Sequence, residues 1–295
     1  MNERCLLILN RKSGPRPDVR AAVKALKGEV KLDVCIPWSG KQTRAEIRRA
    51  VKKGATRVIA GGGDGTLNAV VNALLRMELA ETVSFGFVPL GTANDFARGC
   101  GDMGDDIATS LRRATVGDAR PTDIGLVNGN GFINVASGGF GAMVTATTPK
   151  EMKKSLGGLA YTLHGLSRLS DMWPQACRFE IDGAEVLEVP LSFMAVGNSR
   201  FAGGGFDVTP EAKLDDGLLD LSFLSFDTAA LPANPVRELL EPTNPENERL
   251  VYRTFRTCVM ETEGVFHLNL DGEPMEAERF EFSVLPGAIR MVRGE

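Results

Sequence analysis

Apolar and polar positions alternate along the first part of the chain in a pattern typical of strands followed by helices. Short apolar runs rich in β-branched residues predict strands at residues 5–9, 30–36, 57–61 and 84–90. Between them, apolar residues spaced by three and four predict helices at 17–27 and 41–53, from Thr66, from about Thr92 and around 106–114. This order predicts a doubly wound parallel sheet that binds its ligand at the carboxyl ends of the strands.

After about Asp123 the pattern becomes one of strands separated by Gly, Asn, Asp and Pro turns. The strands are expected at residues 123–128, 131–137, 177–181, 188–197, 217–226, 265–270 and 279–285. A helical pattern at 149–169 interrupts them, and the Pro- and Asn-rich residues 231–250 are expected to form a loop with at most a short helix. The second part is therefore predicted to be an antiparallel, sandwich-like β domain.

Length and composition agree with two soluble domains. The 295 residues are enough for two cores, and 43% hydrophobic with 24% charged residues is ordinary for globular proteins. We predict an α/β plus β fold with an α/β domain at residues 1–124 and a β-rich acceptor domain at 125–285, with residues 286–295 packing back on the first.

Charge, cysteines and hydropathy exclude several classes of protein. The formal charge of -4 argues against a dedicated nucleic-acid binder, so no nucleic-acid partner is expected. The five cysteines form no CxxC pair, which favours reduced thiols in a cytosol-like compartment. No apolar run approaches the roughly 18 residues of a membrane span, so any membrane contact would be made from the surface.

The stretch "GGGDGTLNA", Gly61 to Ala69, has four glycines in its first five positions, directly after a predicted strand. A dinucleotide fingerprint would need a third glycine where Thr66 stands, and a Walker A loop would need a lysine after Gly65. A plain turn would need only one or two glycines. A glycine loop between a strand and a helix exposes backbone N–H groups, which suits phosphate oxygens, and Thr66 is then either the helix N-cap or a phosphate ligand.

A second loop, "PLGTANDFARG", repeats the arrangement from Pro89 to Gly99. Two such turns after neighbouring parallel strands would converge on one polyphosphate. Each also contributes an aspartate, Asp64 and Asp95. A carboxylate beside a phosphate is repelled unless a cation intervenes, so the pair indicates magnesium, which takes only one or two carboxylates. The alternative for Asp95 is charge complementarity with a helix N-terminus.

With these loops the sequence resembles the diacylglycerol-kinase-type catalytic domain family, and in particular the bacterial YegS-like lipid kinases. The resemblance continues through "DIGLVNGNGFINVASGGFGA", "YTLHGLSRL", "GNSRFAGGGFDVTPEAKLDDGLLDL" and "LNLDGEP", and it covers nearly the whole chain. It implies a phosphofructokinase- or NAD-kinase-like first domain, ATP as co-substrate, and Mg²⁺ (or Ca²⁺ in its place) as cofactor.

The resemblance also implies roles for individual residues. The residues that match nucleotide-binding positions are Gly63, Asp64, Gly65, Thr66, Leu67, Asn68, Ala69 and Thr92. Those that match metal-binding positions are Asp216, through its carboxylate, and Lys213 and Leu218, through main-chain carbonyls. Glu273 matches the catalytic base, and a metal-linked acidic network is implied for Asp64, Asp95 and Asp123.

Two positions depart from the family pattern. Ala69 stands where the family usually has glutamate, so the side-chain contacts of that position are missing. Pro37 stands where a threonine touches nucleotide in the family, and no contact is assigned to it.

Glu273 also has an interpretation of its own. Asp271 and Gly272 lie between two strand-like runs and predict a hairpin turn, after which Glu273 is either a solvated turn residue or a general base. A base must reach the acceptor hydroxyl within about 3 Å or through one water. "KLDDGLLDL" can likewise be a polar turn, and neither His164 nor His267 has a Ser or Cys partner at recognisable spacing.

Two basic segments bear on membrane contact. Lys150, Lys153 and Lys154 precede an apolar stretch, which suits either docking on anionic headgroups or a helix packed over the β domain. Residues 41–57 hold seven lysines and arginines against Glu46 alone, either as a solvated helix face or as a source of electrostatic attraction.

The sequence therefore predicts an ATP- and magnesium-dependent kinase of a membrane lipid, cytoplasmic and in transient contact with the inner membrane face. A kinase of a soluble substrate such as NAD and a catalytically decayed nucleotide-binding regulator are the alternatives. The identity of the lipid and the formation of a homodimer are left open.

Overall fold

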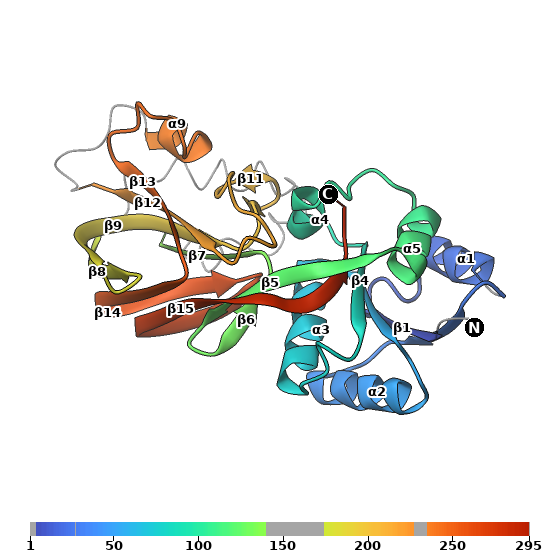
Figure 1. Ribbon diagram of the computed structural model, residues 1–295. Helices are drawn as coiled ribbons and strands as arrows, with labels where there is room; N and C mark the ends of the chain where they lie inside the picture. The colour runs from blue at the N-terminus through green and yellow to red at the C-terminus, as the bar shows by residue number, and fades with distance from the viewer. Residues whose placement is uncertain (1–3, 27, 140–173, 227–234, 295) are drawn as a thin grey trace. The chain divides into compact units, whose positions relative to one another are not determined.

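The computed structural model describes residues 4–26, 28–139, 174–226 and 235–294 (Figure 1). The chain divides into two compact units. The first unit comprises Met1–Thr122 and Gly287–Glu295, and the second comprises Asp123–Pro286. The helix expected at 149–169, with its lysines, lies outside the described residues.

The first unit is built around a parallel sheet in the order β2-β1-β3-β4. Its strands are β1 (Arg4–Leu9), β2 (Lys31–Cys35), β3 (Arg57–Gly62) and β4 (Ser84–Pro89). Its helices are α1 (Pro17–Ala25), α2 (Gly40–Lys52), α3 (Asp64–Arg76), α4 (Asp95–Gly99) and α5 (Ile107–Val116). The alternation of strands and helices predicted from the sequence is therefore confirmed.

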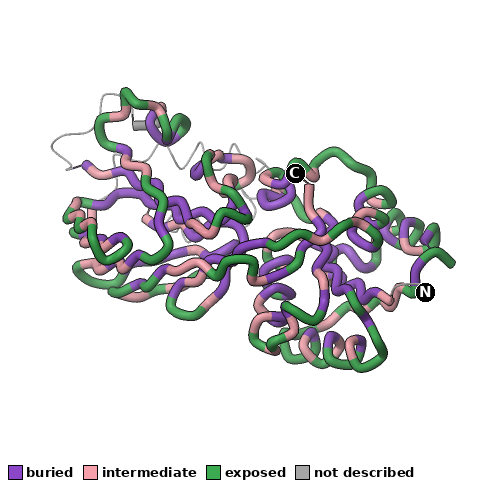
Figure 2. The backbone as a smooth tube through the Cα atoms, in the orientation of Figure 1, coloured by how far each residue is buried: buried purple, intermediate pink, exposed green. Residues whose placement is uncertain are grey.

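Apolar positions of these elements form the core of the first unit. One face of the sheet packs with α1 and α5, through residues such as Val19, Ala22 and Leu111. On α3 the expected apolar face is buried at Leu67, Val70, Val71 and Leu74. Figure 2 shows buried residues running along these strands, with exposed residues on the outer helix surfaces.

The chain returns to the first unit at its C-terminal end. In β15 (Glu273–Val292), Met291 pairs in parallel with Phe85 of β4, and Ile289 and Met291 are buried. Arg293 then donates from Nε to Thr122 Oγ1 over 3.2 Å, and the Gly294 N–H donates to Asp102 Oδ2 over 3.4 Å. These contacts make the last strand segment part of the first unit's sheet.

Two helix starts differ from the prediction. α3 begins at Asp64 rather than at Thr66, with Gly63 as its N-cap, so of the two alternatives for Thr66 the N-cap is excluded. α4 begins at Asp95 rather than near Thr92, because Asn94 adopts the left-handed conformation with φ 50° and the residues before it cannot be helical.

The second unit is an antiparallel β structure, as predicted. Its strands, besides β15, are β5 (Ala119–Val127), β6 (Asn130–Phe132), β7 (Val135–Gly139), β8 (Gln175–Ile181), β9 (Glu185–Gly197), β10 (Phe201–Ala202), β11 (Phe206–Asp207), β12 (Leu219–Ser225), β13 (Leu250–Phe255) and β14 (Thr257–Leu270). α9 (Pro235–Leu240) is the short helix expected within 231–250. β7 and β8 both pair with β9 and β14, and β12 pairs with β9 and β13.

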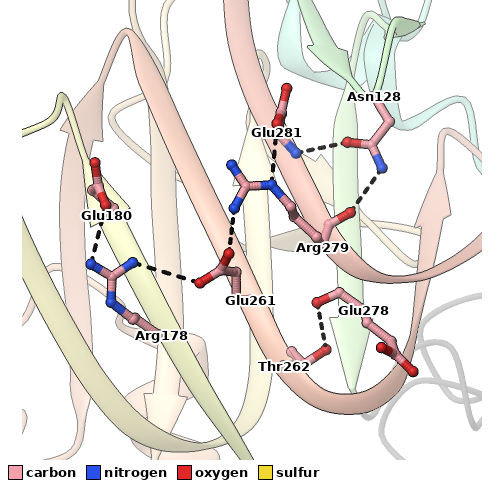
Figure 3. A network of polar contacts seen from close by, with 8 residues as sticks. All are labelled: Asn128, Arg178, Glu180, Glu261, Thr262, Glu278, Arg279 and Glu281. Carbon is pink, nitrogen blue, oxygen red and sulfur yellow. Dashed lines mark hydrogen bonds and ion pairs between the residues drawn. The ribbon is translucent and has the colours of Figure 1, made fainter.

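β14 and β15 extend beyond the predicted strands. The prediction was too short because one face of each strand carries polar residues, which break the apolar pattern. Figure 3 shows the charged contacts on this face. Arg178 on β8 contacts Glu180 and Glu261, and Arg279 on β15 contacts Glu261 and Glu281. Charged residues at these positions interrupt the apolar alternation that marks a strand, although they stabilise each other across neighbouring strands.

Among the residues that the structure describes, no helix combines the length and apolar character that a membrane span requires.

Candidate active site

The two glycine loops of the first unit meet backbone to backbone. β3 and β4 are parallel neighbours with Gly62 opposite Pro89, so the loops after them leave the same sheet edge. A Cβ on Gly91 would lie 2.5 Å from Gly63 Cα and 2.7 Å from Asn94 Oδ1. Neither Gly63 nor Gly91 has a left-handed φ. Close approach, rather than unusual backbone dihedrals, therefore requires glycine here.

Asn94 and Asp64 hold the second loop in place. Asn94 accepts the Gly91 N–H at Oδ1 over 2.9 Å and donates from Nδ2 to the Gly91 carbonyl over 3.1 Å. The carboxylate of Asp64 accepts the N–H groups of Asp95 over 3.3 Å and Phe96 over 3.1 Å. Asp64 thus joins the first glycine loop to the start of α4, a role that the sequence analysis missed.

A third loop, after β1, reaches the same edge through Asn10. Its Oδ1 accepts the N–H groups of Lys12 (3.0 Å) and Ser13 (2.8 Å), and its Nδ2 donates to Thr66 Oγ1 over 3.2 Å. Because the Thr66 oxygen accepts from Asn10, its own O–H proton is directed elsewhere. The sequence analysis did not name Asn10, although an Asn with Ser and Gly shortly after a strand signals such a side-chain turn.

Gly65 differs from the other glycines of the cradle, which we define as the three loops after β1, β3 and β4. It is exposed in the first turn of α3, and a Cβ there would meet no atom within 4 Å. Alanine would favour a helix by about 1 kcal/mol over glycine. The packing of the protein thus gives no reason for glycine at this position, whereas a ligand lying close to the backbone would.

The remaining nucleotide-site candidates differ in accessibility. Ala69 and Thr92 are exposed, whereas Leu67 is fully buried and Asn68 is 8% exposed. Leu67 therefore offers no accessible surface to a nucleotide.

In the second unit, the hairpin expected before Glu273 is confirmed. Leu270 at the end of β14 pairs with Glu273 at the start of β15. Between them, Asp271 and Gly272 have φ values of 50° and 102°, which is typical of the two-residue turn with both central residues left-handed. The Gly272 N–H donates to Asn269 Oδ1 over 2.7 Å. The side chain of Glu273 is exposed at this turn.

The turn is anchored by the buried carboxylate of Asp271. It accepts three backbone N–H groups over 2.7–3.0 Å, from Ile133, Asn134 and Val135. The Asp271 N–H in turn donates to the Val135 carbonyl over 3.1 Å. These bonds fix the backbone next to Glu273, so the orientation of a base at this position would be set by the segment that joins β6 to β7.

Asp123 holds the turn that contains the candidate metal ligands. Its N–H donates to the Leu214 carbonyl over 2.7 Å, and its Oδ2 accepts the Gly217 N–H over 2.7 Å. Within the turn, Asp216 Oδ1 accepts the Leu218 N–H over 3.0 Å. The structure thus brings Asp123 to the turn of Asp216, while Asp64 lies with Asp95 in the first unit.

The donors of this turn are oxygen atoms, which Mg²⁺ and Ca²⁺ prefer. Asp216 and Lys213 are exposed residues, and Leu218 is half-buried. Within the described ranges, no group of three or more His, Cys, Asp or Glu side chains could hold a metal. The predicted set of one carboxylate and two main-chain carbonyls contains a single such side chain and only oxygen donors, and it stays a prediction.

A buried carboxylate lies on the strand that follows this turn. Asp220 is 1% exposed, and its Oδ1 accepts the Tyr252 O–H over 2.8 Å. Burial raises the pKa of Asp220 to about 6, although the bond from Tyr252 opposes the shift. Burial and the neighbouring Asp220 raise the pKa of Tyr252. Tyr252 also accepts the Glu211 N–H over 3.2 Å, so the pair anchors the segment before the metal-site turn.

His267, the described member of the two histidines, is exposed on β14. Its Nδ1 lies 3.4 Å from Glu276 across the strand pair. This contact with a surface carboxylate gives it no partner for nucleophilic catalysis.

Comparison with known proteins gives matches over the whole chain. The diacylglycerol kinase catalytic domain family matches residues 4–127, and the YegS C-terminal NAD kinase beta sandwich-like domain matches residues 134–293. A "Probable lipid kinase YegS-like" of Chromohalobacter salexigens is 38% identical over 290 residues, which cover 98% of this chain and 93% of that protein. Its counterpart in Pseudomonas aeruginosa (strain UCBPP-PA14) is 39% identical over 291 residues, with coverages of 98% and 94%.

Solved structures share the fold. A putative diacylglycerol kinase from Bacillus anthracis str. Sterne superposes with a TM-score of 0.79 at 23% identity, covering 99% of this chain and 98% of that one. A further structure from the same organism, titled as a diacylglycerol kinase, has a TM-score of 0.70 at 20% identity, with coverages of 99% and 97%. The predicted combination of a kinase-type α/β domain with a sandwich-like β domain is confirmed.

Proposed function

The chain belongs to the diacylglycerol kinase catalytic domain family, with the YegS-like lipid kinases, and from this membership and the geometry of the cradle we propose that it transfers the γ-phosphate of ATP to a hydroxyl of a membrane lipid. The protein would act from the cytoplasm, at the inner face of the membrane. The other YegS-like proteins named above carry "probable lipid kinase" in their names, which supports a lipid as the acceptor.

One observation supports the proposal most strongly, namely the open backbone at Gly65 within a cradle that is otherwise closely packed. The glycines at 63 and 91 bring two loops together, and Gly65 leaves the start of α3 uncovered. N–H groups in the first turn of a helix have no intrahelical partner and carry partial positive charge. Phosphate oxygens of ATP would bind there, with the Thr66 hydroxyl as a further donor.

In the proposed reaction, the acceptor oxygen attacks the γ-phosphorus of ATP. A new P–O bond forms as the bond to the β–γ bridging oxygen breaks, and ADP leaves with that electron pair. The proton of the acceptor hydroxyl passes to the Glu273 carboxylate. Because phosphoryl transfer depends mostly on positioning and charge neutralisation, the anchoring of this turn by Asp271 would contribute to turnover in addition to the base itself.

The residues expected to hold magnesium are Asp216, through its carboxylate, and Lys213 and Leu218, through main-chain carbonyls. When bound, the ion would supply positive charge that offsets the developing charge on phosphate oxygens. Asp123 would keep the turn in shape, since it bonds to the backbone on both sides of Asp216. Asp64 and Asp95, the other members of the predicted acidic network, lie together in the first unit.

The proposal is tested by incubating the pure protein with ATP labelled at the γ-phosphate, Mg²⁺, NAD and mixed bilayers, followed by separation of lipids and soluble products. Label in a lipid with the wild type, and none with Glu273→Gln, is the expected result. Label in NAD instead would show a kinase of a soluble substrate. ATP binding without any transfer would show a decayed regulator, for which Ala69 would be the suspected cause.

A further inference from the structure

The end strand of the first unit's sheet carries a small apolar patch. Among the residues that the structure describes, β2 pairs only with β1, so its other edge has no strand beside it. Three large apolar residues within or just after it are exposed: Val34 (43%), Ile36 (38%) and Trp38 (70%). Trp38 is the most exposed large apolar residue of the described chain. We call these three residues the β2 edge patch.

The exposed indole is held in place by its neighbours. The Arg11 guanidinium carbon lies 4.2 Å from the centre of the Trp38 ring, and Arg11 also donates to the Trp38 carbonyl over 3.0 Å. The Trp38 N–H donates to Gln42 Oε1 over 2.8 Å. Ile36 lies against the backbone of Gly14, where a Cβ would clash with its side chain. The patch is thus fixed by the fold while its apolar surface faces solvent.

Basic residues lie on the two segments next to Trp38, namely the loop after β1 and the start of α2. Arg11 and Lys12 are exposed on the loop after β1, and Lys41 is exposed at the start of α2. The Arg44 guanidinium lies beside Gly40, because a Cβ built there would be 3.6 Å from it.

The nearby acidic groups are neutralised by other partners. Asp33 forms an ion pair with Arg4 at 2.9 Å, and Glu46 forms one with Arg49 at 2.6 Å. The surface around Trp38 is therefore locally positive, although the chain as a whole carries a formal charge of -4.

We propose that the β2 edge patch is a docking surface for an anionic lipid bilayer, with the indole of Trp38 in the headgroup region and the cations on lipid phosphates. Indole rings favour the interface between membrane and water, and basic residues are attracted to anionic leaflets. The inference rests on the proposed function, since a lipid acceptor requires contact with a membrane. It names the surface that makes this contact.

Two other occupants fit the observations less well. A nucleobase stacked on Trp38 would leave Val34 and Ile36 without a partner. A second copy of the chain docked through the same patch would place like charges opposite each other, because a two-fold interface uses the same surface on both sides.

The test uses the fluorescence of Trp38. The sequence has two tryptophans, so a Trp173→Phe variant of the full chain reports Trp38 alone. It is titrated with phosphatidylglycerol vesicles, with phosphatidylcholine vesicles, and with ATP in the absence of lipid, and vesicle binding is measured separately by sedimentation. We expect a blue shift and co-sedimentation with the anionic vesicles only.

Variants separate the contributions to binding. Trp38→Ala should lower vesicle partitioning about ten-fold, as expected for the loss of a buried large apolar side chain. Lys12→Gln and Lys41→Gln should each lower it about five-fold, an effect that added salt should remove. Val116→Ala, which alters an exposed apolar residue on α5, is the matched control and should leave binding unchanged.

The proposed kinase activity is measured in parallel on lipid dispersed in detergent, where Trp38→Ala should stay within about two-fold of the wild type because no bilayer is needed. Unchanged vesicle binding by Trp38→Ala would overturn the docking surface. So would an emission shift caused by ATP alone, or by protein concentration together with a doubled mass. Vesicle binding through Trp38 without phosphorylation of any lipid would contradict the proposed function while supporting the docking surface.

Discussion

The two units place a carboxylate next to their candidate functional groups in different ways. In the first unit, the partly exposed Asp64 accepts two N–H groups at 3.1 and 3.3 Å from the loop after β4. In the second, the buried Asp271 accepts three N–H groups at 2.7 to 3.0 Å. Asp271 is therefore held in the interior by backbone N–H groups, whereas Asp64 is accessible enough to serve both the backbone and a bound ligand.

The two units also differ in the backbone conformation of their candidate sites. Gly63 and Gly91 have ordinary φ values and are required by close approach, whereas the turn before Glu273 uses left-handed residues. In the first unit, the loops of Gly63 and Gly91 thus pack against each other, and the backbone at Gly65 stays open. The second unit fixes the conformation of a tight turn to present one side chain. Substitutions should affect nucleotide binding in the first case and turnover in the second.

The largest effect is expected for Glu273→Gln. The variant keeps the size and hydrogen-bonding capacity of the side chain but cannot accept a proton, so kcat should fall about 10³-fold with an unchanged Kd for ATP. The measurement is single-turnover transfer of label, with ATP binding followed by calorimetry. Glu278→Gln, an exposed position further along β15, is the control and should retain activity. Equal activity of the two variants would remove Glu273 from its proposed role.

The second-largest loss of activity is expected for Gly91→Ala. Its Cβ would lie 2.5 Å from Gly63 Cα, so the two loops must separate, and kcat/KM should fall about 10²-fold because the reacting groups are misplaced. The unfolding free energy should fall by about 1–3 kcal/mol through overpacking.

Gly65→Ala is the companion variant, since its Cβ meets no protein atom within 4 Å. It should unfold no more easily than the wild type, yet bind ATP more weakly because the methyl group occupies space near the phosphates. Unchanged ATP affinity in Gly65→Ala would contradict a phosphate at this position.

Asp271→Asn should lower stability and turnover together. Asparagine offers one acceptor oxygen and a competing N–H₂ group, so at least one buried backbone N–H loses its partner, at a cost of about 2 kcal/mol in unfolding free energy. Turnover should fall because the turn that presents Glu273 is less well fixed, while ATP affinity stays the same. Urea unfolding and steady-state kinetics measure the two effects. A loss of ATP affinity with normal turnover would contradict the assignment.

Asp64→Asn should have a smaller effect on stability, about 1 kcal/mol, because its bonds are longer and the group is partly solvated. The larger consequence should be weaker ATP binding, through displacement of the start of α4. Asp64→Asn should thus change mainly ATP affinity, whereas Asp271→Asn should change stability and turnover. If both variants changed the same parameter, the difference between the two units would not hold.

The smallest effect on activity is expected for Asp220→Asn, which should change only the pH dependence of stability. The pKa of Asp220 is raised from 3.8 to about 6 by burial, so the folded state binds its proton more tightly than the unfolded state. The contribution of this group to the unfolding free energy therefore decreases as pH rises from about 4 to 6. The variant lacks this decrease, so its stability relative to the wild type should rise across that interval. Urea unfolding at pH 4 and pH 7 measures the difference.

The periodic elements of the first unit were predictable because their apolar residues follow one pattern. The strand at 57–61 and the buried face of α3 are where the spacing placed them. The start of α4 was not predictable from spacing, because it depends on the left-handed Asn94 and on N–H groups capped by Asp64, which is 31 residues away. Such a bond between distant segments leaves no local pattern.

In the second unit, the two-residue turn at Asp271 was predictable from Asp-Gly chemistry. The lengths of β14 and β15 were not, because charged side chains such as Arg279 and Glu261 form their contact across the two strands (Figure 3). The hydrogen bonds from residues 133–135 to Asp271 could not be predicted either, since these backbone N–H groups lie 136 to 138 positions away in the sequence.

The pairing of Met291 with Phe85 has a consequence for how this gene can be divided. A fragment that stops at residue 122 lacks the strand that completes the sheet of its own module, and a fragment from 123 onward carries that strand with no sheet to join. Cutting the chain at residue 122 therefore does not separate the two units. A gene for the first unit alone would have to encode residues 1–122 and 287–295 in one reading frame.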